Sequence, residues 1–216
     1  MYEILSAFQL INLQCTKKFI SLHLCEARGA FVSATNHYFM GLRKQSEENI
    51  EWDWVACTLN PHFEGNDQRH LTGDDALITE TVVHWYFGAD NTGDMRLRPN
   101  IEGAWEKMKS KGPVMLVTAD GCMGGAASGQ ACAMDAQLQF CQVVTAMGAL
   151  SKGGNLVMRM ASLCDHASLC LVYLVSCVFA RTSVCKPTTS ASTSSETFLV
   201  CEHFEGIAED YLQALL

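Results

Sequence analysis

Residues 116–121 read Leu-Val-Thr-Ala-Asp-Gly, an apolar run that ends in a carboxylate and a glycine. Three other segments also place a polar or glycine-rich element at one end of an apolar run: His-Leu-Cys-Glu-Ala-Arg-Gly-Ala-Phe at 23–31, Gly-Gly-Asn-Leu-Val-Met-Arg-Met at 153–160 and Ser-Glu-Thr-Phe-Leu-Val-Cys at 195–201. In an open α/β sheet such strand ends line one crevice, where ligands bind. We therefore expect Asp120, Arg159 and Glu196 to converge from three strands beside a turn at Gly29, an arrangement typical of a nucleotide-like cofactor and a charged reaction centre.

The apolar periodicity predicts alternating strands and helices. Strands are expected at 19–25, 52–59, 114–118, 155–160, 182–185 and 197–201, and helices at 30–44, 75–87, 100–109, 130–150 and 165–179. Asn100 is expected to cap its helix, and Gly153 and Gly154 to end the helix at 130–150. The fold class is therefore α/β, a three-layer sandwich with a mostly parallel sheet and an antiparallel pair at its edge. Dehydrogenases and methyltransferases share this pattern, so the fold alone does not choose a function.

Composition places this chain among folded globular proteins. It has 216 residues, 49% of them hydrophobic and 18% charged, which suits one domain with a sizeable core. The net charge of −8 argues against a stand-alone nucleic-acid binder, although Arg28, Arg159 and Lys186 are candidates for a local basic groove. The most apolar run, 167–180, is too short to span a bilayer, and the first residues lack the basic region of a signal peptide.

The cysteines indicate a reducing environment rather than a disulfide framework. There are eleven of them, an odd number, with irregular spacing and no Cys-x-x-Cys pair. Cys164, His166 and Cys170 are the nearest approach to a zinc site, but their spacing fits no common closed site. We expect neither a metal nor a membrane partner.

Six blocks of sequence, in a fixed order, resemble the FtsJ-like ribose 2′-O-methyltransferases, and among them the members that act on mRNA caps. The similarity runs from about Leu22 to Cys201. The blocks are Cys25-Glu26-Ala27-Arg28-Gly29-Ala30-Phe31, Thr58-Leu59-Asn60-Pro61, Trp85-Tyr86-Phe87-Gly88, Asp90-Asn91-Thr92-Gly93-Asp94, Val117-Thr118-Ala119-Asp120-Gly121 and Lys186-Pro187-Thr188-Thr189-Ser190.

This resemblance implies a Rossmann-like methyltransferase fold with S-adenosyl-L-methionine as cofactor. It implies methyl transfer to the ribose 2′-oxygen of the second transcribed nucleotide of capped mRNA, in the nucleus and cytoplasm. The Gly29 turn would lie against the methionine and ribose part of the cofactor, and residues 91–94 near its adenosine. The implied cofactor-binding residues are Glu26, Ala27, Gly29, Ala30, Phe31, Asn91, Gly93, Asp94 and Asp120.

The family uses a Lys-Asp-Lys-Glu catalytic tetrad, and the resemblance assigns its second, third and fourth places to Asp120, Arg159 and Glu196. Arginine stays protonated in proteins, so Arg159 cannot act as the base, although it can orient or stabilise the 2′-oxygen. The first lysine belongs upstream of the first strand, and Lys17 and Lys18 lie too close to that strand to match it.

The expected domain organisation is an N-terminal segment at 1–18, a methyltransferase domain at 19–202 and a C-terminal tail at 203–216 with a loosely attached helix. The unmatched first lysine implies that segment 1–18 is truncated, or that a partner supplies the RNA-binding surface. Two alternatives to an active methyltransferase stay open: a catalytically degenerate module that binds cofactor or RNA, and a dinucleotide oxidoreductase. The latter is disfavoured because the chain lacks a full Gly-x-Gly-x-x-Gly motif.

Overall fold

The structure is a computed structural model that describes residues 1–13, 17–45, 49–67, 71, 74–121, 129–160, 163, 165–191 and 196–216, with the backbone alone at 129–132. Within these residues, seven strands form one sheet in the order β3-β2-β1-β4-β5-β7-β6. The strands are β1 (Lys18–Leu24), β2 (Glu51–Cys57), β3 (Trp85–Tyr86), β4 (Val114–Ala119), β5 (Leu150–Met160), β6 (Phe179–Cys185) and β7 (Thr197–Phe204).

Most of the sheet is parallel. β1 pairs in parallel with β2 and β4, and the parallel pairing continues outward to β3 on one side and β5 on the other. β7 runs antiparallel to both of its neighbours, β5 and β6. The predicted α/β class, with a mostly parallel sheet and an antiparallel edge, is therefore confirmed.

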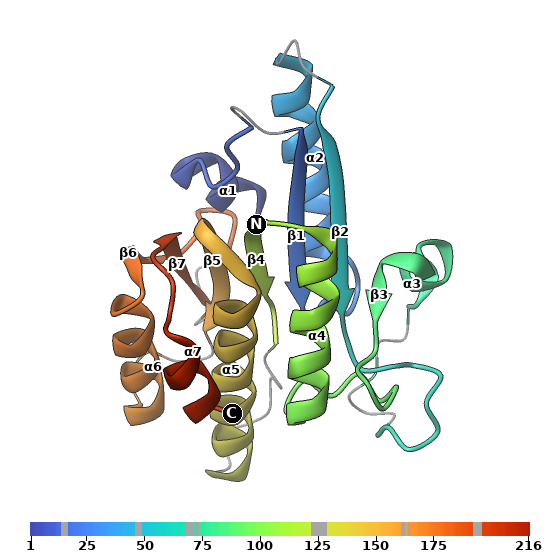
Figure 1. The fold of residues 1–216 in the computed structure, drawn as a ribbon, viewed down its shortest axis with the longest axis vertical. Helices are drawn as coiled ribbons and strands as arrows, with labels where there is room; N and C mark the ends of the chain where they lie inside the picture. Colours follow the sequence, from blue (N-terminus) through green and yellow to red (C-terminus); the bar gives the residue numbers. More distant parts are fainter. Residues whose placement is uncertain are drawn as a thin grey trace.

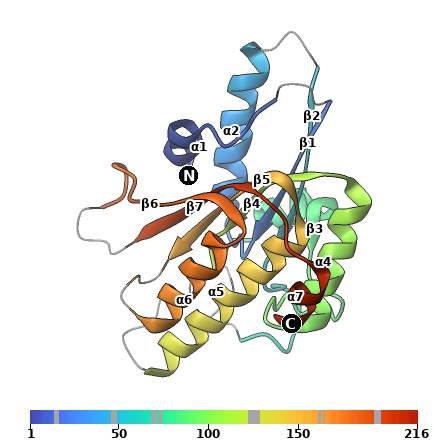
Figure 2. The ribbon, with the colours of Figure 1, turned by 60° about the vertical axis from the view of Figure 1, so that its left-hand side comes forward.

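Helices cover both faces of the sheet, so the molecule has three layers (Figures 1 and 2). Figure 2 shows α1 (Tyr2–Phe8) and α2 (Ala30–Gln45) on one face. The opposite face carries α4 (Arg98–Lys111), α5 (Gly129–Ala149), α6 (His166–Ser176) and α7 (Glu209–Ala214), and the short α3 (Ala76–Glu80) lies beside β3. No helix among the described residues is long and apolar enough to cross a membrane.

Two large clusters of buried apolar side chains fill the spaces between these layers. One joins α4, α5, α6 and α7 to the sheet, and the other joins α1 and α2 to its opposite face. A smaller cluster holds α3 and β3 against β2 through Trp54, Ile78 and Trp85. Burial of each such face supplies most of the stability of its helix, because short helices are marginal on their own.

The helix predicted at 75–87 is wrong over most of its length. α3 ends at Glu80, a 3-10 turn covers Val82–His84, and Trp85 and Tyr86 then form edge strand β3. Trp85 is 5% exposed and its ring meets that of Trp54 edge-on. Burial of this aromatic residue against β2 therefore overrides the helical pattern of the segment.

Two predicted helix boundaries are also wrong. Asn100 is not an N-cap, because α4 begins at Arg98 and Asn100 lies within its first turn. Gly153 and Gly154 lie within β5, which begins at Leu150 directly after α5. The β4–β5 register shifts between Val114 and Leu116, so the glycines belong to a bulge in which Gly153 has a φ of +83°.

Both ends of the described chain pack into the domain. Leu5 is fully buried in the α1–α2 cluster, and the Leu10 carbonyl accepts a hydrogen bond of 2.9 Å from the Asn155 side chain. At the other end, β7 continues to Phe204, past the predicted end at Cys201, and Leu212 of α7 is 6% exposed in the large cluster. The expectation of a loosely attached tail is therefore wrong, because its apolar side chains belong to the core.

Candidate active site

The strand register brings the expected site residues to one edge of the sheet. Leu24, the last residue of β1, is opposite both Cys57 of β2 and Ala119 of β4. Asp120 therefore follows β4 directly beside the turn that follows β1, and its N–H donates to the Leu24 carbonyl at 3.1 Å. This position, between strands that lead to opposite halves of the sheet, is where ligands bind in open α/β sheets.

Arg159 and Glu196 reach the same edge from β5 and β7. Ala119 is opposite Met158, so Arg159 lies one residue further along, level with Asp120. β7 runs the other way, and its first residue, Thr197, is opposite Met160. Glu196 therefore reaches the same ends of the strands from just before β7, and the three charged side chains meet as the sequence predicted.

The Arg159 guanidinium lies between the two carboxyl groups, and we call Asp120, Arg159 and Glu196 the charged triad. The Arg159 Nε is 2.8 Å from Asp120 Oδ1, and the Arg159 Nη1 donates to Glu196 Oε1 at 3.5 Å. Another guanidinium nitrogen donates to the Asp120 carbonyl at 3.1 Å. These side chains are 25–34% exposed, so the triad is both held in place and open to solvent.

Asp120 has an unusual affinity for protons. Burial, with a smaller contribution from the nearby Glu196 carboxylate, raises its pKa to about 6 against the opposing effect of the Arg159 charge. Groups with perturbed pKa values often mark functional sites, because chemistry near neutral pH needs them. Asp120 can therefore gain or lose a proton within the physiological range.

The turn after β1 combines a left-handed glycine with a buried carboxyl group. Gly29 has a φ of +77°, which favours glycine, and a Cβ there would lie 2.0 Å from Leu77 Cδ2, so the Leu77 side chain of α3 would have to move. Glu26 is 1% exposed and accepts a hydrogen bond from the Phe31 N–H at 3.1 Å, at the start of α2. Burial, followed by the Asp120 charge, raises the pKa of Glu26 to about 7.

The other residues predicted on this turn differ in where their side chains lie. Ala27 and Ala30 are exposed. Phe31 is 8% exposed in the α1–α2 cluster, with its ring 6.1 Å from that of Phe198. Phe31 therefore offers its backbone to the turn and its side chain to the core.

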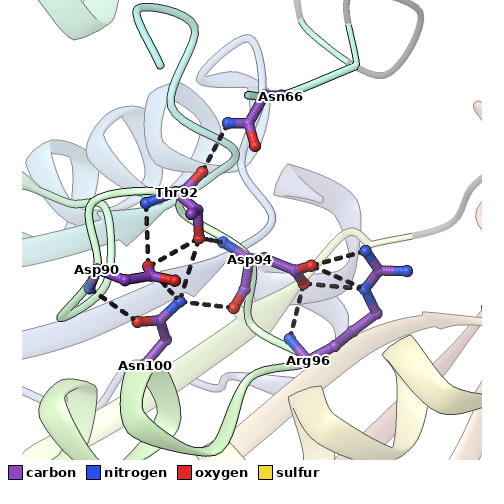
Figure 3. A network of polar contacts seen from close by, with 6 residues as sticks. All are labelled: Asn66, Asp90, Thr92, Asp94, Arg96 and Asn100. Carbon is purple, nitrogen blue, oxygen red and sulfur yellow. Dashed lines mark hydrogen bonds and ion pairs between the residues drawn. The ribbon is translucent and has the colours of Figure 1, made fainter. Parts of the chain in front are cut away.

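A dense polar network shapes the loop at 88–96, which we call the 88–96 loop (Figure 3). Asn100 is completely buried, and its side-chain oxygen accepts from the Ala89 N–H at 2.7 Å. Its amide nitrogen donates to Asp90 Oδ1 and to the Asp94 carbonyl, each at 2.9 Å. Gly93, at φ +78°, passes so close to the segment after β2 that a Cβ would lie 1.9 Å from the Thr58 carbonyl oxygen.

Asp94 projects from this loop with its carboxylate paired to Arg96. The guanidinium donates to both carboxylate oxygens, with a closest contact of 2.6 Å. Burial acts to raise the pKa of Asp94, but the hydrogen bonds from Arg96 bring it below its ordinary value. Asn91, also predicted near the cofactor, is exposed at φ +65° and its carbonyl accepts from Asn60.

Two residues that sequence reasoning missed support the charged triad. The Gln142 side chain, fully buried on α5, accepts from the Gly121 N–H at 2.9 Å and donates to the Gly121 carbonyl at 3.1 Å. Ser190 Oγ donates to Glu196 Oε2 at 3.3 Å. A glutamine on the apolar face of a predicted helix was the available signal for Gln142, because buried amides need partners.

These residues fit a nucleoside cofactor of the kind that the fold accommodates. Backbone at Gly29 and Gly93 takes conformations that leave little room for side chains, and Asp94 offers carboxylate oxygens to hydroxyl or amine donors. Asp120 follows β4 at the same ends of the strands. The sequence also predicts a small-residue loop at 122–129; residues 122–128 lie outside the described residues, and Gly129 is the first residue of α5.

The candidate zinc ligands do not come together as a site in the described part of the chain. Cys164 lies outside the described residues. His166 and Cys170 are one turn apart on the exposed side of α6, with Cys170 Sγ 3.7 Å from His166 Nε2. No group of three or more potential metal-ligating side chains is found within the described ranges.

Comparisons with known proteins agree with this geometry. The family described as FtsJ-like methyltransferase matches residues 1–204. The chain is 40% identical over 220 residues to the cap-specific mRNA (nucleoside-2′-O-)-methyltransferase 2 of Danio rerio, and 41% identical over 210 residues to that of Pongo abelii. These matches cover 100% and 95% of the chain but 28% and 26% of the relatives, so the chain spans about a quarter of their length.

A solved structure shows the same fold. Human methyltransferase-like protein 13, in complex with SAH, superimposes with a TM-score of 0.53 and 12% sequence identity. The superposition covers 99% of this chain and 86% of that one. At this low identity the likeness concerns the fold alone, which is that of S-adenosylmethionine-dependent methyltransferases.

Proposed function

This chain belongs to the FtsJ-like methyltransferases, and we propose that it methylates the ribose 2′-oxygen of capped mRNA with S-adenosyl-L-methionine as cofactor. The observation that carries the proposal is the charged triad at the crevice edge. Asp120, Arg159 and Glu196 occupy the positions that the family resemblance assigns to catalytic residues, and both carboxyl groups contact Arg159.

The cofactor would lie along the carboxyl ends of β1, β2 and β4. It supplies an electrophilic methyl group on a sulfonium. The Gly29 turn would hold its methionine and ribose part, with Glu26, Ala27, Ala30 and Phe31 shaping that turn, while Asn91, Gly93 and Asp94 would hold its adenosine. The support for this placement is that the turn after β1 lies beside Asp120, and that the Asn60 N–H, just after β2, donates to the Thr92 carbonyl of the 88–96 loop at 2.9 Å.

Two members of the charged triad, Arg159 and Asp120, have distinct chemical capacities. A ribose hydroxyl is a weak nucleophile, so transfer needs a proton acceptor and stabilisation of the negative charge that develops on oxygen. Arg159 keeps its proton and can stabilise that oxygen or orient it. The proton must go to another group, and Asp120, whose pKa is raised to about 6, is the carboxylate best suited to accept it near neutral pH.

The substrate class rests on the relatives. Those of Danio rerio and Pongo abelii are named as cap-specific mRNA methyltransferases, and we propose that the second transcribed nucleotide is the acceptor, in the nucleus and cytoplasm. A net charge of −8 gives this chain little overall attraction for RNA. A basic surface from a partner or from a further protein region would therefore contribute to RNA binding.

Two experiments in sequence test the proposal. Calorimetric titration with S-adenosylmethionine, and with a nicotinamide dinucleotide as control, should show saturable binding of the first alone. The purified chain is then given capped RNA whose second nucleotide carries either a 2′-hydroxyl or a 2′-hydrogen. Methyl transfer to the first RNA and not to the second supports the proposed reaction, and transfer to both contradicts the proposed acceptor.

A binding module without turnover is the competing function, because Arg159 stands where the family has lysine. Arg159→Lys separates the two, since a lysine in this surrounding can lose its proton and act as a base. If wild type binds the cofactor but is inactive and Arg159→Lys gains transfer, the chain is a degenerate copy. If wild type is active and Asp120→Asn loses about 100-fold or more in rate, the chain is an enzyme in which Asp120 accepts the proton.

A further inference from the structure

Glu3 of α1 holds the loop that follows β6. One of its carboxylate oxygens accepts from the N–H and hydroxyl of Thr188, at 2.9 and 2.6 Å. The other accepts from the N–H and hydroxyl of Thr189, at 3.3 and 3.0 Å. A single side chain therefore binds four donors on two successive residues that lie about 185 positions away in the sequence.

The part of α1 that carries Glu3 is packed into the domain. Ile4 and Leu5, the next two residues of α1, are completely buried against the sheet and α2. The Tyr2 ring lies 5.3 Å from that of His37 and 5.5 Å from that of Tyr38, both on α2. Because α1 is packed on both sides of Glu3, the backbone that carries its side chain is held in place, and the loop binds to its carboxylate.

The loop leads directly to the charged triad. Its turn is closed by a hydrogen bond of 3.1 Å from the Ser190 N–H to the Pro187 carbonyl, and Pro187 is buried. Ser190 Oγ then donates to Glu196 Oε2 at 3.3 Å, while Glu196 Oε1 accepts from Arg159. A continuous series of contacts therefore runs from Glu3 through the threonines and Ser190 to Glu196.

We propose that Glu3 is a positioning residue of the active site: it holds the Thr188–Thr189 turn so that Ser190 fixes the Glu196 carboxylate against Arg159. The consequence for catalysis rests on the proposed methyltransferase function, whereas the consequence for the geometry of Glu196 does not. The hydrogen bonds from Thr188 lower the pKa of Glu3 to about 2, so its carboxylate stays ionised throughout the neutral range.

The test begins with a readout that needs no activity. Glu3→Gln replaces one acceptor oxygen by an amide donor that faces the Thr189 N–H, and Thr188→Val removes a hydroxyl while leaving α1 intact. The control is Glu102→Gln, on α4, where the carboxylate pairs with Arg98 at 2.9 Å. Carbon-13 labelling of glutamate side chains reports the Glu196 carboxyl signal, which Glu196→Gln assigns, and hydrogen exchange reports the Ser190 amide.

Both Glu3→Gln and Thr188→Val should shift the carbon-13 signal of the Glu196 carboxyl group and speed hydrogen exchange at the Ser190 amide about tenfold or more. The control, Glu102→Gln, should change neither. Faster exchange at 188–190 with the Glu196 signal at its wild-type position would overturn the proposal, because Glu3 would then support the loop alone. Thr188→Val keeps the question decidable if Glu3→Gln does not fold.

A double-mutant cycle then links the geometry to methyl transfer. Glu3→Gln should lower kcat about fivefold while leaving the KM for cofactor unchanged, and should have little further effect when Ser190→Ala is already present. Equal, additive effects in the two backgrounds would show that Glu3 does not act through Ser190. If wild type transfers no methyl group but the carboxyl signal still shifts, the proposed function fails while the positioning role of Glu3 stands.

Discussion

The two sides of the candidate site, the 88–96 loop and the charged triad, are built in opposite ways. At the 88–96 loop, the completely buried Asn100 of α4 has partners for both ends of its amide, and Gly93 lies against the backbone that follows β2. In the charged triad the side chains are 25–34% exposed and are joined by contacts between full charges. Buried, satisfied hydrogen bonds specify a shape, whereas half-exposed charges remain available to a substrate. Substitutions on the first side should therefore mainly alter stability, and those on the second mainly chemistry.

The largest expected effect on stability comes from Gly93→Ala. The new Cβ would lie 1.9 Å from the Thr58 carbonyl oxygen, and φ is +78°. Backbone strain and the clash together should lower the free energy of unfolding by about 4 kcal/mol. Denaturant unfolding measures this loss, and calorimetry should show weaker cofactor binding.

Gly153→Ala is the matched control for that variant. Gly153 has a similar φ of +83°, but nothing lies within 4 Å of a Cβ added there. It should lose only about 1 kcal/mol, the cost of the conformation itself. Equal losses in the two variants would mean that contact with the Thr58 carbonyl does not constrain the 88–96 loop.

Glu26→Gln tests the residue that lies between the two sides. The Glu26 carboxyl has an ordinary pKa of 4.5, which burial and the Asp120 charge raise to about 7 in the folded chain. Between these values the unfolded state is ionised while the folded state keeps the proton, so stability is lost as pH rises. Relative to wild type, Glu26→Gln should therefore gain about 3 kcal/mol between pH 4 and pH 8. Parallel stability–pH curves for the two proteins would contradict a buried, protonated Glu26.

Asn100→Ala probes the centre of the polar network. It leaves the Ala89 N–H and the Asp90 carboxylate without their buried partner, which should lower the free energy of unfolding by about 2 kcal/mol. Asn66→Ala is the comparison, since Asn66 donates to the Thr92 carbonyl from the rim of the same network at 2.8 Å (Figure 3). If Asn66→Ala lowers the free energy of unfolding as much as Asn100→Ala, the stability of the loop does not depend on burial.

The smallest stability effect should come from Arg159→Gln. The guanidinium is 30% exposed, and ion pairs near the surface contribute little, so unfolding should change by less than about 1 kcal/mol. The same variant should lose methyl transfer if Arg159 stabilises the reacting oxygen. A stability loss as large as that of Asn100→Ala would remove the distinction between the two sides of the crevice.

The sequence predicted most of the fold, because apolar periodicity reports which face of each element is buried. It failed where a local pattern meets a distant contact. Trp85 continues a helical pattern, yet its ring packs on Trp54 and the segment becomes a strand. Gly153 looks like a helix stop, yet it forms a bulge because β5 must shift its register against β4.

The candidate site shows the same division. Asp120, Arg159 and Glu196 were predictable because strand ends meet at one edge of a parallel sheet, and the structure brings them together. Asn100 has a sequence position typical of a helix cap, and its bonds to the 88–96 loop depend on the path of that loop. The contact of Glu3 with Thr188 spans 185 positions, so no local pattern predicts it.

The antiparallel strand β7 has a consequence for how the chain is made. It lies between β5 and β6, yet both of those strands precede it in the sequence. While a ribosome is still synthesising residues 197–204, the facing edges of β5 and β6 have no partner, and each can pair with a strand of another nascent chain. The sheet is complete only when β7 has paired with both β5 and β6. Slow translation of residues 197–204 should therefore favour aggregation.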